Sequence, residues 1–125
     1  MRHVDETVAV PLERLDLTQQ GVAAAVLELQ RRAYGIEAEL IGSDEIPALS
    51  ETLEELQASG EIFLGAYLEG ILVGAISWRV DAGVLDLHRL VVDPSRFRAG
   101  IATALVRAAL AAEPEVDRAV VQTGS

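Results

Sequence analysis

The stretch from residue 85 to residue 106 holds the residue types most able to do chemistry. In it an apolar strand pattern stops at Pro94, and a loop with Arg96 and Arg98 leads to a helix pattern that begins at Gly100. The first amides of a helix have no partner inside the helix and carry partial positive charge. A glycine there lets a phosphate approach the backbone, and the arginines add charge. The spacing therefore predicts an anion-binding loop.

This loop differs from two common phosphate-binding motifs. It has no Gly-Lys-Ser/Thr sequence, which excludes a Walker loop, and only one glycine in the turn, which excludes the dinucleotide-binding fingerprint. A glycine at a helix start also occurs for structural reasons alone. The loop by itself therefore leaves both interpretations open.

Eight elements must position this segment. The hydrophobic pattern predicts a strand at 8–15, helices at 19–33 and 47–58, strands at 62–67, 71–80 and 84–92, a helix at 100–112 and a strand at 118–123. Gly35 is expected to end the first helix. Gly70 and Gly83 predict tight turns, hence an antiparallel meander, and the last strand is expected to be buried. The order β-α-α-β-β-β-α-β indicates a single α/β domain over residues 1–125, with a mixed central sheet.

Composition restricts the possible functions. Half of the 125 residues are hydrophobic, so the chain can bury a core, and the absence of cysteine excludes a cysteine nucleophile. The first 70 residues carry fourteen acidic residues against four arginines, which repels nucleic acid and favours a cationic partner, or only solvates the surface. No apolar run is long enough to cross a membrane. We expect a cytoplasmic protein without a metal, and arginine without lysine indicates a bacterial source.

The loop and its flanks resemble a known motif. The acetyl-CoA-binding motif of the GNAT superfamily of N-acetyltransferases is usually written Gln/Arg-x-x-Gly-x-Gly/Ala, and the segment LVVDPSRFRAGIATAL at 90–105 is similar to it. Gly100 and Ala102 match the last two positions, whereas Phe97 stands where Gln or Arg is usual. The order of elements agrees with that superfamily over nearly the whole chain.

The resemblance implies which residues bind acetyl-CoA. The loop and first helical turn would hold the pyrophosphate, mostly through backbone amides, at Phe97, Arg98, Ala99, Gly100, Ile101, Ala102 and Thr103. The strand residues Leu90, Val91 and Val92 would hold the pantetheine arm, with main-chain groups of Leu90 and Val92 binding it as an added strand. The Leu90 amide would also polarise the thioester carbonyl, a catalytic role.

The resemblance also requires a general base that takes a proton from the substrate ammonium. In the superfamily an acidic residue four positions before Leu90 often does this, and here that residue is Asp86; His88 could also accept a proton near neutral pH. Because side chains alternate along a strand, Asp86 and His88 are expected to share a face with Leu90. Alternatively, the two side chains only solvate the strand or pair with each other.

The expected activity is direct transfer of an acetyl group from acetyl-CoA to a primary amine of a small molecule or peptide. The sequence stops after the last predicted strand, where superfamily members normally continue with a helix, often carrying a tyrosine that protonates the leaving thiolate, and two closing strands. This apparent C-terminal truncation predicts a homo-oligomer or completion by another chain segment. The alternatives are a coenzyme A-binding module without turnover and an unrelated α/β interaction domain.

Overall fold

The computed structural model describes residues 10–41, 51–95 and 100–121. Five strands form one sheet in the order β1-β2-β3-β4-β5. They are β1 (Leu12–Leu15), β2 (Ile62–Leu68), β3 (Ile71–Asp81), β4 (Val84–Val92) and β5 (Arg118–Val121). The first four pair with their neighbours in antiparallel fashion, and β5 pairs parallel to β4. The expected mixed sheet with its meander is confirmed.

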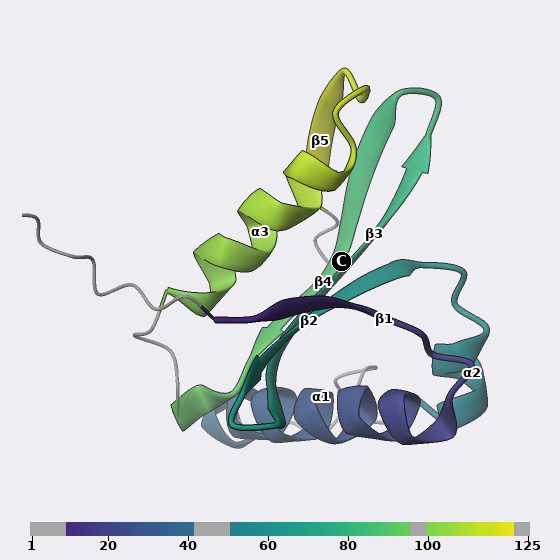
Figure 1. Cartoon of the computed structure of the whole chain (residues 1–125). Helices are drawn as coiled ribbons and strands as arrows, with labels where there is room; N and C mark the ends of the chain where they lie inside the picture. The colour runs from purple at the N-terminus through teal and green to yellow at the C-terminus, as the bar shows by residue number, and fades with distance from the viewer. Residues whose placement is uncertain (1–9, 42–50, 96–99, 122–125) are drawn as a thin grey trace, which may run out of the picture.

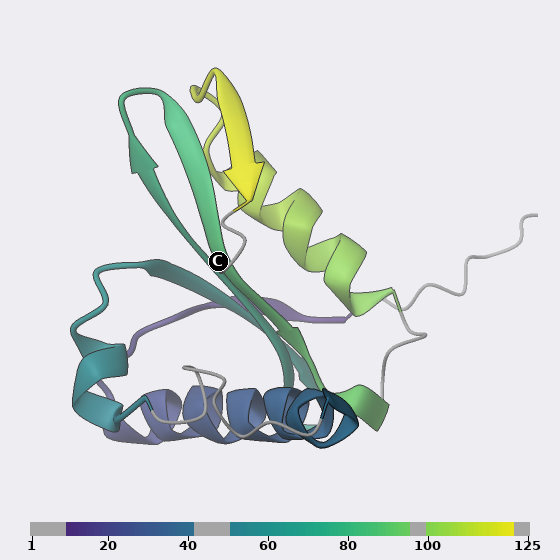
Figure 2. The same ribbon diagram turned by 180° about the vertical axis from the view of Figure 1, so that it is seen from behind.

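Helices cover both faces of this sheet (Figures 1 and 2). The first face, here the α1 face, packs against α1 (Gln20–Ile41) and α2 (Leu53–Gln57). The opposite one, the α3 face, packs against α3 (Ile101–Ala112). Each face has its own buried cluster, which includes Leu29, Leu56 and Phe63 on the α1 face and Trp78, Leu85 and Leu105 on the α3 face.

The two turns of the meander follow the sequence prediction. Glu69 and Gly70 have φ values of 52° and 79°, and Ala82 and Gly83 have φ values of 52° and 77°. Positive φ at both central residues is the conformation whose twist matches that of two antiparallel strands. A glycine as the second residue of each pair removes half of the steric cost. These turns bring β3 and β4 together in the register that places the candidate site.

Two helix predictions were wrong in extent. Helix α1 continues through Gly35 to Ile41, because the helix formers that follow in the sequence outweigh the cost of about 1 kcal/mol for one interior glycine. The second helix is only five residues long. It begins after Thr52, whose hydroxyl accepts a hydrogen bond from the Glu55 amide while the Glu55 carboxylate accepts one from the Thr52 amide. Pro47, the expected start, lies outside the described residues.

The prediction of a buried last strand was also wrong. In β5, Ala119 is exposed and Val120 is half-buried. The reason is its place in the sheet: among the described strands β5 is the last in the order and pairs with β4 alone. Strand β1 lies at the other edge, as predicted, but it begins at Leu12, after Pro11, and not at residue 8.

Candidate functional site

The first turn of α3 has backbone amides without an acceptor inside the helix. Its N-cap is Gly100, which is exposed, lies in the left-handed region with φ 73° and provides no side-chain cap. The first intrahelical hydrogen bond is donated by the Ala104 amide to the Gly100 carbonyl. The amides of residues 101–103 precede it and have no acceptor within the helix. They therefore form the start of an anion site, whereas the predicted loop residues Phe97, Arg98 and Ala99 lie outside the described residues.

The start of α3 is held against the sheet by one buried side chain. Ile101 is buried and packs over β3 at Gly74, where a Cβ atom would lie 2.7 Å from the Ile101 Cγ2 atom. The glycine thus allows the close approach of helix and strand. On the outer side, Ala102, Thr103, Val106 and Arg107 line a shallow hollow of about 310 Å³. Two residues of the first turn, Ala102 and Thr103, thus border this hollow together with Arg107.

Strand β4 has an open edge next to this helix. Its pairing with β5 covers only Val84 to Leu87, and among the described residues no strand pairs with residues 88–92 on that side. The Asp93 amide donates to the Val73 carbonyl of β3 at 2.8 Å. Because backbone groups point to alternate sides along a strand, the amides and carbonyls of Leu90 and Val92 point toward the open edge. An extended ligand can bind these groups as a further strand would.

A β-bulge at His88 changes the faces of β4. Trp78 of β3 pairs with Leu87 and Ser77 pairs with Arg89, so His88 is the extra residue. Before the bulge Leu85 and Leu87 pack into the α3 face, which directs Asp86 to the α1 face.

After the bulge the alternation is reversed. Val91 packs into the α1 face and Val92 into the α3 face, so Leu90, which is 41% exposed, points to the α3 face. The prediction that Asp86 and His88 share a face with Leu90 was therefore wrong. The physical reason is the bulge, which shifts the side-chain alternation by one residue.

The two candidate bases have different surroundings. Asp86 is half-buried and lies between two paired strands, opposite Arg79 on β3 and Val120 on β5. His88 follows Leu87, the last residue of β4 that pairs with the described part of β5, and its side chain is 27% exposed. Its Nδ1 atom is 3.9 Å from the Glu61 Oε2 atom, so the structure pairs His88 with Glu61.

A buried ion network adjoins His88, and sequence reasoning missed it. The Arg89 guanidinium donates from Nη1 and Nη2 to the two oxygens of Glu51, at 2.6 and 3.0 Å, and from Nε to Oε1 of Glu61 at 2.7 Å. It also donates to Gln30 at 2.8 Å and lies 5.5 Å from the centre of the Phe63 ring. Residues of α1, β2 and β4 and of the segments before α2 and β2 are joined in this way. A lone arginine in a strand pattern gives no signal of it.

The network shifts the pKa values of Arg89 and Glu51. Burial disfavours the charge on Arg89, but the hydrogen bonds to Glu51 and Glu61 outweigh it and raise the pKa of Arg89 above its ordinary value. Burial likewise raises the pKa of Glu51, but the hydrogen bonds from Arg89 and Gln30 lower it further, so the net shift is downward. Arg89 and Glu51 therefore stay ionised, and the network supports β4 on the α1 face of the sheet.

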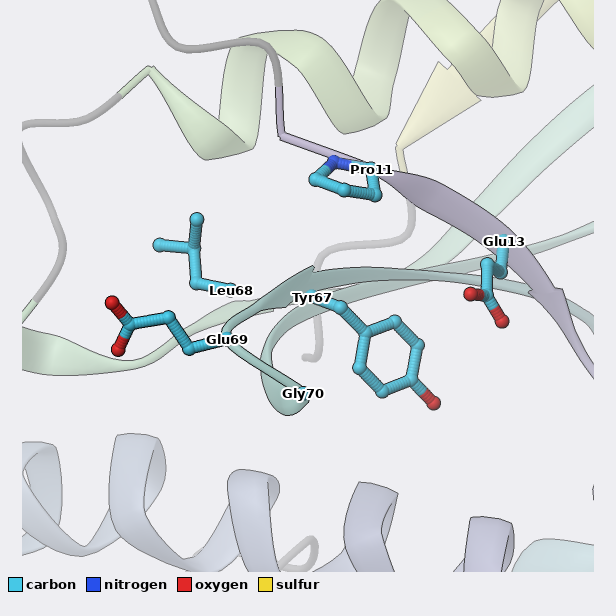
Figure 3. A pocket seen from close by; sticks show the side chains of 6 residues that line it. All are labelled: Pro11, Glu13, Tyr67, Leu68, Glu69 and Gly70. Atoms are coloured by element: carbon cyan, nitrogen blue, oxygen red, sulfur yellow. The ribbon is translucent and has the colours of Figure 1, made fainter.

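A second hollow, of about 490 Å³, is lined by residues of β1 and of the β2–β3 hairpin (Figure 3). Pro11 and Glu13 line it from β1 and the residue before it, and Tyr67, Leu68, Glu69 and Gly70 line it from the β2–β3 hairpin. Burial, with a smaller contribution from Glu13, raises the pKa of Tyr67. None of its lining residues belongs to β4 or α3, so it is separate from the candidate site.

Residues 10–41, 51–95 and 100–121 contain no group of three or more His, Asp or Glu side chains placed to hold a metal ion. Within the same ranges no helix is both long enough and apolar enough to span a bilayer.

Comparison with known proteins decides the family. Residues 23–122 match the acetyltransferase (GNAT) family. The chain belongs to the GNAT family. It is also 42% identical over 96 residues to the UPF0157 protein YqkA of Bacillus subtilis (strain 168), a match that covers 77% of this chain and 28% of YqkA. The chain thus spans less than a third of the length of that relative.

Solved structures show that the fold is that of GNAT acetyltransferases. The PaiA N-acetyltransferase of Thermoplasma acidophilum, solved with coenzyme A, is similar with a TM-score of 0.72 and 21% identity, over 86% of this chain and 73% of that one. An aminoglycoside 6′-N-acetyltransferase complexed with coenzyme A is similar with a TM-score of 0.66 and 21% identity, over 90% of this chain and 61% of that one. The sequence prediction of a GNAT-like fold is confirmed.

Proposed function

We propose that this chain is an N-acetyltransferase that moves the acetyl group of acetyl-CoA directly to a primary amine of a small molecule or peptide. The observation that carries the proposal is the open edge of β4 at residues 88–92, next to the uncapped first turn of α3. Val92 and Ile101 pack in one cluster, so the two features are neighbours. Family membership and two similar acetyltransferases solved with coenzyme A support it.

The residues present fit coenzyme A. A pyrophosphate needs backbone donors and positive charge, which the amides of Ile101, Ala102 and Thr103 supply together with the dipole of α3. We assign Phe97, Arg98, Ala99 and Gly100 of the preceding segment to the same group. The pantetheine arm, with its amides, needs an extended partner, which the outward-pointing groups of Leu90 and Val92 provide, with Val91 between them.

We assign two chemical tasks to this chain: polarising the thioester carbonyl and accepting a proton from the acceptor. Acetyl-CoA, when bound, supplies the acetyl group as an activated thioester. The Leu90 amide points to the open edge and would donate to the thioester oxygen as negative charge develops there. Asp86 or His88 would take the proton of the acceptor ammonium. The sequence has no cysteine, which agrees with direct transfer without a thiol acyl-enzyme.

The acceptor class follows from charge and comparison. The sequence carries twice as many acidic as basic residues, which favours a cationic acceptor. The aminoglycoside 6′-N-acetyltransferase among the similar structures acts on an amine of that kind. We therefore propose a primary ammonium group as the acceptor, in a reducing cytoplasmic setting of a bacterium.

Calorimetry with coenzyme A tests the proposed pyrophosphate site at the first turn of α3. Gly100→Val places a branched Cβ where the phosphate would approach, so binding should be lost while the melt stays cooperative. The matched control is Gly70→Val, because Gly70 has the same left-handed backbone with φ 79° and open space around it. This control carries similar strain and should bind like wild type. Equal binding of coenzyme A by the two variants would contradict the proposed pyrophosphate site.

A further inference from the structure

His88 is the first residue of β4 beyond its pairing with the described part of β5. It is the bulge residue, and it lies two positions before the Leu90 amide that points to the open edge. Its side chain is 27% exposed, so a ligand at that edge can reach the ring. Asp86, by contrast, is flanked by paired strands on both sides. His88 lies within residues 88–92, with which an extended ligand would pair, whereas Asp86 lies outside them.

Glu61 is a fixed neighbour of this imidazole. Its carboxylate is 9% exposed, accepts from Ser77 Oγ at 2.6 Å and Arg89 Nε at 2.7 Å on Oε1, and accepts from Arg89 Nη2 at 3.3 Å on Oε2. The His88 Nδ1 atom faces Oε2 at 3.9 Å. Three donors therefore hold the carboxylate in place. The ring nitrogen that faces the carboxylate is thus Nδ1, and we take Nε2 as the nitrogen that meets a ligand.

We propose that His88 is the catalytic base for the acceptor amine and that Glu61 is its positioning residue. In this step an N–H bond of the ammonium breaks, its electron pair stays on nitrogen as the attacking lone pair, and the proton moves to His88 Nε2. The proton then passes to solvent, so the ring is restored after each turnover. The positive charge that develops on the ring faces the Glu61 carboxylate, which stabilises it. This inference rests on the proposed acetyltransferase function.

The test measures coenzyme A thiol release with acetyl-CoA and a panel of primary amines. His88→Ala should lower kcat about 100-fold, with coenzyme A affinity unchanged, and added imidazole should restore part of the rate. Asp86→Asn should lose far less. Glu61→Gln should lower kcat about 10-fold without raising the amine KM, because it loosens the base and not the binding site. Glu115→Gln, at an exposed carboxylate, is the matched control and should keep the wild-type rate.

A double variant separates positioning from structure. If Glu61 acts through His88, Glu61→Gln should have no further effect on kcat in the His88→Ala background. An equal loss in both backgrounds would overturn the positioning role, and a His88→Ala variant with the wild-type rate would overturn the base. Should Glu61→Gln not fold, Ser77→Ala removes one of its three supports and takes its place. A wild-type chain that releases no thiol with any amine would refute the proposed function itself.

Discussion

Removal of the Arg89 charge should destabilise the fold more than any other single arginine substitution in the described strands. The variant Arg89→Met keeps much of the apolar stem but leaves Glu51 and Glu61 facing each other without their shared cation. The side chains of Arg89, Glu51 and Glu61 are only 16%, 15% and 9% exposed, so water screens the two carboxylates poorly.

The expected size follows from that burial. Breaking a buried ion pair at one partner costs roughly 3–5 kcal/mol, and we expect about 3 kcal/mol because some exposure remains. For a domain of this size the melting temperature should then fall by about 12 °C, at roughly 4 °C per kcal/mol. Thermal and urea unfolding followed by circular dichroism measure it. Arg79→Met, at an exposed arginine of β3, is the matched control and should stay within about 0.5 kcal/mol of wild type.

A rescue variant tests the cause of this loss. Changing Glu51 and Glu61 to glutamine in the Arg89→Met background removes the unpaired charges, and should recover at least half of the lost stability. Recovery would show that desolvated carboxylates cause the loss. If Arg89→Met melts like Arg79→Met, or if the triple variant melts no higher than Arg89→Met, the electrostatic reasoning is refuted.

Two further predictions concern stability. Because the pKa of Glu51 is lowered in the folded state, the stability it contributes is present above the ordinary value of 4.5 and is lost as the pH falls through the lower folded value. Urea unfolding at a series of pH values below about 4.5 should therefore show a shallower loss for Glu51→Gln than for wild type, and equal slopes would contradict this. Gly74→Ala places a Cβ 2.7 Å from Ile101 and 3.1 Å from Leu105, so it should cost about 1–3 kcal/mol by overpacking, whereas an unchanged melt would show that α3 can shift freely.

The sequence predicted much of the fold, because its signals were local. Gly70 and Gly83 marked turns that need positive φ, and Gly100 marked the start of α3. These glycines act through their own backbone, so no distant residue has to be known. Gly35 was expected to end the first helix, but the strong helix formers after it extend α1 to Ile41.

The candidate site was predicted less well, because its geometry is not local. The bulge at His88 depends on how β3 and β4 align over their whole length. This one inserted residue places the Asp86 and Leu90 side chains on opposite faces of the sheet. Arg89 contacts residues 28, 38 and 59 positions away, which no pattern within β4 can indicate. The backbone roles of Leu90 and Val92 depend less on side chains and were easier to infer from the motif.

The central claim is acetyl transfer to an amine, and one measurement addresses it directly. The wild-type chain is incubated with acetyl-CoA and a panel of primary amines that includes an aminoglycoside and a peptide, and free thiol and product mass are followed together. We predict thiol release that depends on the amine, with one acetylated amine formed for each thiol. Binding of coenzyme A without amine-dependent thiol release, for every amine tested, would contradict the account and leave a binding module.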